Sequence, residues 1–326
     1  MKKFVAALAC LSMLGLSALA AKPAPAADYP SKPVNMIIAF TAGGSSDVQA
    51  RIMQKYWNKY AGPDCPWVFI YKTGAAGMIG FTEIAKAKPD GYTIGGMNVP
   101  HIVLQTLGQK AQFHAVDSFQ YICQVVNDPQ VVAVRKDSPY KSVQEVYDAA
   151  KAKPGKVKLG MCGPMSGQHL MYMDSMQKFP ESKFAPIFYK GAADQIVAIL
   201  GGEVDVIFGN MNDIMRSLDE LNILGIAAEK ENTQFLPGVK TMRELGFDIV
   251  SDIRRGFAAP KDIAPEHLEK LRAIFKQICE DKDYVDEMIK AGQPHEYMDG
   301  VSFHKWLGEQ FTKSEALLKA SGLMKK

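Results

Sequence analysis

Hydrophobic and polar positions follow two different periods along the chain from residue 34 onward. Short runs rich in β-branched and aromatic residues are typical of strands, and most are followed by a glycine-rich turn and a stretch with helical period. In segment 47–60, Val48, Ile52, Tyr56 and Tyr60 recur every four residues and would share one helical face. The predicted strands are 34–40, 67–71, 92–97, 131–135, 157–161, 185–189, 204–208, 223–227 and 256–259.

Short-range signals predict where further helices begin. Ser142 and Glu145 have the spacing of a capping box, in which two side chains satisfy free N–H groups at a helix start. Thr241 and Glu244 repeat this spacing, and Gly246 would end that helix. Two amphipathic segments near the C-terminus are expected to pack on the first domain. Besides the two helices that follow the capping boxes, the predicted helices are 47–60, 78–87, 265–278 and 302–318.

Strands that alternate with helices favour parallel sheets with helices on both faces, so the fold class is α/β. The 326 residues exceed what one hydrophobic core usually serves, which predicts two domains. Segments 125–129 and 251–256 have the composition of breaks between domains. They divide the chain into domain 1 (28–127 plus 252–326) and domain 2 (128–251). A chain that crosses twice between domains forms a hinge, and a hinge creates a cleft that can close on a ligand.

The N-terminus explains the formal charge of +3, which comes from 38 basic and 35 acidic residues. Lys2 and Lys3 precede the apolar segment 4–20, and small residues follow as far as Ala26. This pattern predicts a signal peptide, residues 1–26, that directs export to the periplasm. Its removal takes away three basic residues and no acid, which leaves 35 of each. A neutral chain excludes capture of anions through a basic surface, and we expect no nucleic-acid partner and a monomer.

Cysteine and histidine give no sign of a metal site or a cofactor. Cys65, Cys123, Cys162 and Cys279 are far apart and form no C-x-x-C pair, so either disulfides or buried thiols are compatible with the sequence. The six histidines lack ligand spacing, and no phosphate-binding glycine motif occurs. We therefore predict neither a metal ion nor a cofactor.

Two glycine-rich loops each join a predicted strand to a predicted helix in the first domain. Ligands of open α/β sheets bind at such strand ends, where glycines admit close approach and the free N–H groups of a helix favour an anion. Two neighbouring loops could grip one carboxylate between them, while Asp47 most simply caps its helix. The candidate ligand-binding residues here are Phe40, Thr41, Ala42, Gly43, Gly44, Ser45, Ser46, Asp47, Gly74, Ala75, Ala76 and Gly77.

The second domain offers matching loops after segments 157–161 and 185–189. Both loops precede predicted helices, so both would present helix N-termini to the cleft. Side chains in the first of them could hydrogen-bond the far end of a ligand. The candidate residues of this domain are Ser166, His169, Lys190, Gly191, Ala192 and Asn210.

A series of short motifs, in this order and spacing, resembles the solute-binding proteins of the tripartite tricarboxylate transporter family, also called Bug proteins. The similarity runs from Tyr29 nearly to the end of the chain. The motifs are Tyr29-Pro30-Ser31-Lys32-Pro33, Phe40 with Gly43, Gly44 and Asp47, Gly74-Ala75-x-Gly77-x-Ile79-Gly80, Pro89-Asp90-Gly91-Tyr92-Thr93, Tyr189-Lys190-Gly191, Gly201-Gly202-x-Val204-Asp205, Leu236-Pro237-Gly238-Val239 and Gly256-Phe257-Ala258-Ala259-Pro260.

The resemblance implies a two-domain periplasmic binding protein fold of the type II-like kind, each domain a mainly parallel sheet flanked by helices, with the ligand cleft at the hinge. It also implies capture of an organic carboxylate and delivery to a permease with one large and one small membrane subunit. In that family the loops matching 40–47 and 74–80 contact one carboxylate. The chain departs from the family at Ala39, Ala42 and Thr73, where proline is common, and at Tyr71, where asparagine is common.

Two other functions remain open at this level. An exported hydrolase could use Ser166 or Cys162 with His169, although Gly163-Pro164-Met165-Ser166-Gly167 is not a G-x-S-x-G nucleophile motif. A sensor that presents its ligand-bound form to a signalling partner would need the same fold. The carboxylate-binding transport protein is the function that the loops and the hinge favour.

Overall fold

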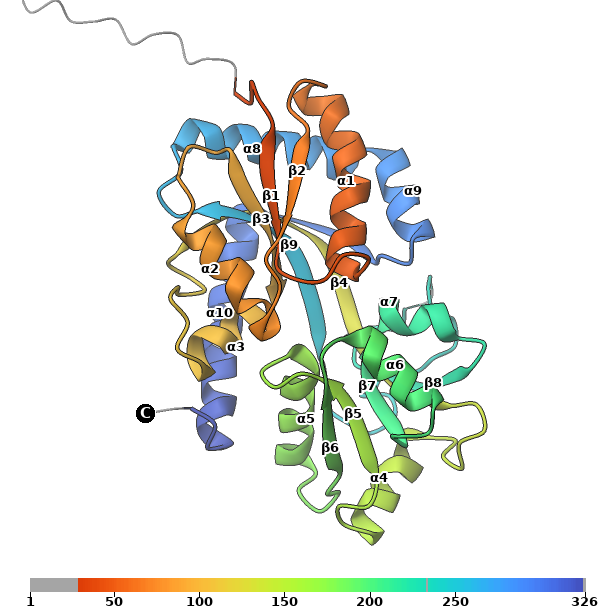
Figure 1. The fold of residues 1–326 in the computed structure, drawn as a ribbon. Helices are drawn as coiled ribbons and strands as arrows, with labels where there is room; N and C mark the ends of the chain where they lie inside the picture. The colour runs from red at the N-terminus through yellow and green to blue at the C-terminus, as the bar shows by residue number, and fades with distance from the viewer. Residues whose placement is uncertain (1–28, 233, 325–326) are drawn as a thin grey trace, which may run out of the picture.

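The computed structural model of the protein describes residues 29–232 and 234–324, and the predicted signal peptide 1–26 lies outside them. Two lobes are joined by long strands (Figure 1). The strands are β1 (Val34–Ile38), β2 (Trp67–Tyr71), β3 (Thr93–Val99), β4 (Phe119–Arg135), β5 (Lys158–Cys162), β6 (Ala185–Tyr189), β7 (Val206–Asn210), β8 (Leu221–Ile226), β9 (Asp252–Pro260) and β10 (His295–Asp299). The helices are α1 (Ser45–Ala61), α2 (Met78–Lys86), α3 (His101–Gly108), α4 (Val143–Ala152), α5 (Gly167–Lys178), α6 (Ala192–Leu200), α7 (Met211–Ile214), α8 (Pro265–Glu280), α9 (Lys282–Lys290) and α10 (Gly300–Ala320).

The strands form a mixed sheet in the order β2-β1-β3-β9-β4-β7-β5-β6, with β8 and β10 also paired to β4. Pairing is parallel between β1 and its neighbours β2 and β3, and between β5 and its neighbours β6 and β7. The pairs made by β4 and β9 are antiparallel. The alternation of strands and helices thus indicates parallel pairing within each triplet, while the strands that connect the lobes make the sheet mixed rather than mainly parallel.

The two segments expected to separate the domains, 125–129 and 251–256, are not loops in the backbone structure. Residues 125–129 lie inside β4, and β9 begins at Asp252. β4 pairs with β9 as far as Pro129 and then with β7 and β8 from Gln130 onward. The chain therefore passes from the first lobe to the second as one continuous strand, β4, that changes partners. Charged residues in these segments are instead paired: Asp128 with Arg255 of β9, and Asp252 with Arg254.

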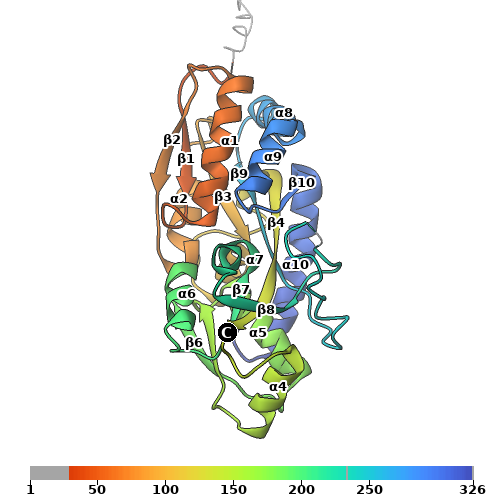
Figure 2. The same cartoon turned by 90° about the vertical axis from the view of Figure 1, so that its right-hand side faces the viewer.

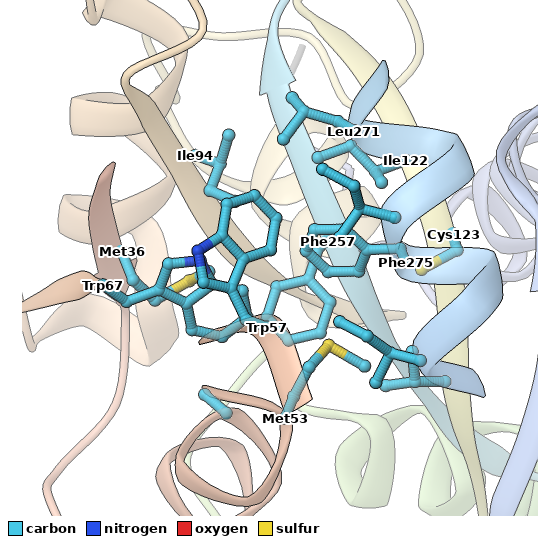
Figure 3. Packing of buried hydrophobic residues seen from close by; sticks show 14 of the residues in the cluster. Met36, Met53, Trp57, Trp67, Ile94, Ile122, Cys123, Phe257, Leu271 and Phe275 are labelled. Carbon is cyan, nitrogen blue, oxygen red and sulfur yellow. The ribbon is translucent and has the colours of Figure 1, made fainter. Parts of the chain in front are cut away.

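In the first lobe, helices α1, α8 and α9 cover one face of the sheet, and α2, α3 and α10 cover the other. Alternate residues of β1 serve the two faces: Met36 and Ile38 face the first set, and Ile37 faces the second. In the first core, Trp57 and Trp67 pack with ring centroids 5.3 Å apart, against Phe257 and Phe275 (Figure 3). The N–H of Trp57 donates to the Cys65 carbonyl at 2.7 Å, so its one polar atom is satisfied.

The second lobe repeats this arrangement. Val132 and Val134 of β4 face a core with α4 and α5, while Val131 and Ala133 face a core with α6 and α7. Both views place α1, α8 and α9 in one lobe and α4, α5 and α6 in the other (Figure 1; Figure 2). A small apolar cluster, which includes Leu104, Met165 and Leu318, joins α3 and α10 to the second lobe.

The capping-box predictions differ in outcome. Ser142 caps α4 and accepts the Glu145 N–H at 3.2 Å, as expected. Thr241 and Glu244 also bond reciprocally, yet 242–246 is a turn and not a helix. The backbone of residue 241 bridges to Ile226 of β8, so tertiary pairing holds the residue before the turn in an extended conformation. The sequence pattern also missed the first half of β4 and the short, polar edge strand β10, because neither is a continuous apolar run.

The four cysteines at positions 65, 123, 162 and 279 are free thiols in the structure. Burial raises the pKa of Cys123 well above its ordinary value, and a hydrogen bond with Cys279 adds to this shift. Both thiols lie in the hydrophobic core between α8 and the sheet of the first lobe. They therefore act as small buried hydrophobic groups, one of the two possibilities that the sequence leaves open.

Candidate functional site

The loop after β1 meets the loop after β7 where the two lobes join. The Ser45 hydroxyl donates to Asp213 Oδ1 at 2.8 Å and accepts from Asn212 Nδ2 at 2.8 Å. Ser45 is the first residue of α1, whereas Asn212 and Asp213 belong to α7. The carboxyl ends of β1 and β7 therefore approach each other, as expected for a binding site of an α/β protein. We call this region the junction site, defined by Ser45, Ser46, Asn98, Asn210 and Asp213.

Asp47 anchors the first loop. Its carboxylate accepts the Gly43 N–H at 2.7 Å, the Tyr71 hydroxyl at 2.6 Å and the Arg51 guanidinium at 3.0 Å. Burial alone would raise the pKa of Asp47, but the bonds from Gly43, Tyr71 and Arg51 outweigh it and hold the pKa below its ordinary value. All the hydrogen-bonding capacity of this carboxylate is directed at the protein. Tyr71 thus supports the loop through Asp47.

The free donors at this helix end belong to the serines and not to the glycines. The Gly43 N–H is bonded to Asp47 and the Gly44 N–H to the Thr41 carbonyl at 3.2 Å. Within the described residues, no side chain caps α1. Because the first N–H groups of a helix have no partner inside it, those of Ser45 and Ser46 are available to an anion. Thr41, Ala42 and Gly43 are exposed, and Phe40 is half-buried.

Ser46 is the more enclosed of the two serines. Only 6% of its surface is exposed, and its hydroxyl lies 3.2 Å from the side-chain oxygen of Asn98 at the end of β3. The side chains of Ser46 and Asn98 are therefore hydrogen-bonded to each other in the buried part of the junction site. Asn98 follows the same rule as the predicted loops, since it ends a strand, but no glycine-rich turn marks it in the sequence.

The second loop contacts the first through aromatic packing. Ala75 and Ala76 have φ values of 48° and 52°, in the left-handed region that residues with a side chain seldom occupy. Such backbone strain concentrates at functional sites. Gly77 is buried against the ring of Phe40, while Gly74 and Ala75 are exposed. The loop is therefore held in an unusual conformation beside the first loop.

In the second lobe, Ser166 is the N-cap of α5. Its hydroxyl donates to the Cys162 carbonyl at 3.0 Å and accepts the His169 N–H at 3.2 Å. The imidazole Nδ1 of His169 accepts the Met165 N–H at 3.1 Å, so the ring is not positioned to take a proton from Ser166. Burial raises the pKa of the Cys162 thiol to about 12, which keeps it protonated. The geometry gives no basis for a nucleophile paired with a base at these three residues.

The remaining candidates of the second lobe lie at different depths. Lys190 is exposed at the end of β6, and Gly191 and Ala192 begin α6 without a side-chain cap. Asn210 is only 9% exposed, and its amide donates to Asp213 Oδ2 at 3.0 Å. Gln168 reaches Asn210 at 3.4 Å and Gln195 at 3.1 Å. The structure thus brings Asn210 into the junction site and leaves Lys190 exposed at the end of β6.

A buried ion pair supports the junction site from behind. Asp128 of β4 and Arg255 of β9 are 0% and 2% exposed, with 2.5 Å between Oδ2 and Nη2. Asp128 also accepts the Asn212 N–H at 3.1 Å, and Arg255 reaches Gln293 at 3.4 Å. Sequence reasoning missed this pair. The sequence did indicate the pair, because Asp128 and Arg255 are charged residues in or beside apolar runs that are typical of strands.

His101, the first residue of α3, is a second buried polar group near this pair. It is 8% exposed, and its Nδ1 has no hydrogen-bond partner among the described residues. Burial, with a smaller contribution from the positive charge of Arg255, lowers the pKa of His101 from 6.5 to about 4. The imidazole is therefore neutral at the pH of ordinary assays and can accept or donate one hydrogen bond.

We expect His101 to make the stability of the protein sensitive to mild acid. The unfolded chain takes up this proton near pH 6.5 and the folded chain only near pH 4, so the contribution is full above pH 6.5 and is lost as pH falls through this window. The loss reaches up to about 3 kcal/mol. Urea unfolding at pH 7.5, 6 and 5 should show wild type losing more stability than His101→Gln. Asp128, whose pKa is raised to about 6, opposes the trend in both proteins and cancels in the comparison.

Two hollows in the described surface lie away from the junction site. One, of about 640 Å³, lies beside β1 and α2 and has Lys32, Lys72 and Lys86 in its wall. Its lysines are partly committed, since Lys72 lies 3.6 Å from Glu83 and Lys32 stacks over Tyr92.

The other hollow, of about 650 Å³, lies between α5 and α10. Its charged side chains pair with one another, for example Arg243 with Asp248 at 2.8 Å and Lys178 with Asp174 at 3.1 Å. A lone carboxylate therefore gains less there than at the uncapped end of α1.

Two structural features are absent from residues 29–232 and 234–324. No group of three or more His, Cys, Asp or Glu side chains in these ranges is arranged to hold a metal ion. Nor does any helix in the same part of the chain combine the length and the apolar character needed to cross a membrane.

Two α/β lobes with helix N-termini directed at their junction define a solute-binding protein of the periplasmic kind. The profile of the tripartite tricarboxylate transporter family receptor matches residues 51–323, and the chain belongs to this family. The family consists of receptors and not of enzymes, in agreement with the geometry at Ser166 and His169. The α/β fold class and the family resemblance found in the sequence are both confirmed.

Individual relatives agree with this assignment. The chain is 30% identical to the UPF0065 protein in the gbd 5' region of Cupriavidus necator over 97% of this chain and 95% of that protein. The structure of the periplasmic binding protein BugD matches with a TM-score of 0.81 at 26% identity, covering 91% of this chain and all of that one. The structure of MatC from Rhodopseudomonas palustris with bound malate shares the fold, with a TM-score of 0.78 at 19% identity over 89% of this chain and 100% of that chain.

Proposed function

We propose that the protein captures a small organic carboxylate in a cleft between domain 1 (28–127 plus 252–326) and domain 2 (128–251). The observation that carries this proposal is the uncapped N-terminus of α1 at the junction site, where the N–H groups of Ser45 and Ser46 lack partners inside the helix. A carboxylate is the organic anion that two adjacent N–H donors and the positive end of a helix favour.

Main-chain donors carry the recognition, because the basic side chains nearby are already committed. Arg51 bonds Asp47 and Arg255 bonds Asp128, while Lys190 is exposed. The chain predicted after export is neutral overall, so no general attraction for anions adds to these donors. MatC, which shares the fold, holds malate in its structure.

Export and delivery complete the proposed function. The signal peptide 1–26 takes the protein to the periplasm, where it works as a monomer. The loaded protein then delivers its ligand to the large and small permease subunits of a tripartite tricarboxylate transporter. Membership of the receptor family and the similarity to BugD support this role.

A carboxylate ligand is expected to stabilise the protein against heat. Because it binds only the folded state, a ligand at 100 times its Kd adds about 2.7 kcal/mol to the free energy of unfolding. Purified chain 27–326 should therefore melt several degrees higher with at least one member of a panel of aliphatic and aromatic mono- and dicarboxylates that includes amino- and hydroxy-substituted acids. A folded protein that no panel member stabilises would contradict the proposal.

Two variants at the same position make this test specific to the helix end. Proline is well tolerated at the first position of a helix, so Ser45→Pro should keep α1 while removing one of the two proposed donors. Ser45→Ala keeps the N–H and removes only the hydroxyl. The proline variant should bind at least tenfold more weakly than the alanine variant, because a hydrogen bond to a charged group contributes about 1.5–3 kcal/mol. Equal affinities would exclude this N–H as a donor.

A further inference from the structure

Asp213 places a negative charge beside the helix end to which the proposed function assigns a ligand carboxylate. The side chain is half-buried. Its Oδ1 accepts the Ser45 hydroxyl at 2.8 Å, and its Oδ2 accepts the Asn210 amide at 3.0 Å. Both partners are neutral. The carboxylate therefore lies one side chain away from the N–H donors of α1.

The charge of Asp213 has no local counter-ion. Asp47 and Asp128, the other two acids close to the junction, each bond an arginine. Across the described residues, by contrast, no Lys, Arg or His nitrogen lies within 4.0 Å of an Asp213 oxygen. The negative charge of Asp213 acts on groups on both sides of the site. Burial is the largest cause that raises the pKa of Asp128 and of Cys162, and the charge of Asp213 raises both further.

An unbalanced carboxylate constrains what can bind next to it. A ligand whose only charge near α1 is a carboxylate would meet Asp213 at short range, and like charges in a partly buried site repel strongly. A ligand with a positive group one carbon away from its carboxylate avoids this repulsion. Its carboxylate can take the Ser45 and Ser46 N–H groups while its ammonium donates to Asp213, in a charge-assisted hydrogen bond.

We propose that Asp213 determines specificity and that the ligand is a carboxylate with an amino group on the adjacent carbon, an α-amino acid. This inference rests on the proposed function, since it assumes that the ligand carboxylate occupies the end of α1. A simple dicarboxylic acid carries two carboxylates and no positive group, so it cannot balance the negative charge of Asp213. The amide of Asn210 keeps the Asp213 carboxylate oriented and does not neutralise it.

Matched acids that differ only at the carbon next to the carboxylate test this assignment. We suggest calorimetric titration with L-aspartate, L-malate and succinate, with L-alanine, L-lactate and propionate, and with L-phenylalanine, phenyllactate and 3-phenylpropionate. Within at least one series, the amino acid should bind wild type at least tenfold more tightly than its hydroxy and unsubstituted counterparts. Asp213→Asn keeps the size and the acceptor for Ser45 but removes the charge, and it should reduce this preference at least tenfold.

Asp219→Asn is the control, because Asp219 is exposed in the same segment and its replacement changes the net charge equally. It should leave the preference unchanged. If hydroxy or unsubstituted acids bind wild type as tightly as the amino acids, or if Asp213→Asn alters the ratio less than twofold, the inference is wrong while the proposed function stands. If none of these acids and no member of the wider panel binds, both fail. Should Asp213→Asn not fold, the wild-type ratios and Asp213→Ser decide.

Discussion

Replacing Asp128 by alanine is expected to lower the free energy of unfolding by about 3–5 kcal/mol, because it leaves the Arg255 guanidinium buried without a counter-charge. Arg255 is 2% exposed, and its other contacts, to Gln293 and Asn212, are neutral and long at 3.4 Å. The same substitution removes the acceptor of the Asn212 N–H. Since domains are stable by only about 5–15 kcal/mol, this variant should lie near the limit of folding.

Urea unfolding of three variants separates the buried pair from ordinary surface pairing. Asp137→Ala breaks another Asp–Arg contact, at 2.8 Å to Arg135, but on the surface, and should cost less than about 1 kcal/mol. The double variant Asp128→Leu with Arg255→Met leaves no unpaired charge and should lose less stability than Asp128→Ala. If Asp128→Ala costs no more than Asp137→Ala, the pair does not support the junction as we describe.

Gly77→Ala is expected to damage both stability and binding. Gly77 has φ +94°, and a Cβ there would lie 2.8 Å from the Phe81 ring and 2.9 Å from the Phe40 ring. The left-handed backbone costs about 1–2 kcal/mol for an L-residue, and overpacking adds about 1–3 kcal/mol. Because Phe40 begins the first loop, its displacement should also weaken carboxylate binding at least tenfold.

Gly155→Ala provides the matched control for that substitution. Gly155 has φ +70°, but a Cβ would meet nothing within 4 Å, and the residue lies in an exposed turn of the second lobe. It should show the backbone cost alone, with ligand affinity unchanged in titration calorimetry. If the two variants bind a carboxylate equally well, the packing of Phe40 on Gly77 does not position the first loop.

Much of the local structure could be predicted because it depends on neighbours in the sequence. The strands that became β2 and β6 were predicted to the residue, and α4 begins where the box of Ser142 and Glu145 indicates. The failures have one physical cause. Asp128 looks like a linker residue in sequence, yet it is completely buried in β4, because partners distant in the chain, Asn212 and Arg255, bond its carboxylate.

The junction site shows the same limit. The strand-to-helix loops with Ser45 and Ser166 were visible in the sequence, because a glycine-rich turn between a strand and a helix is a local signal. The sequence did not show which N–H groups of the loop remain free. That depends on the hydrogen bond that the Asp47 carboxylate accepts from the Gly43 N–H. Asp213 gave no signal at all, as an acid in a short polar segment is ordinary until its neighbours are known.

The sequence by itself determined the α/β class, the family and the loops at the strand ends. Periodicity, turn residues and motif order depend only on residues that are close together in the sequence. Only the tertiary structure decided that Asp213 meets Ser45 across 168 residues and that Arg255 meets Asp128 across 127. The reason is physical: the energy of a charge depends on its burial and on its nearest partners in space. The chemistry of the ligand is therefore set by contacts that no stretch of the sequence contains.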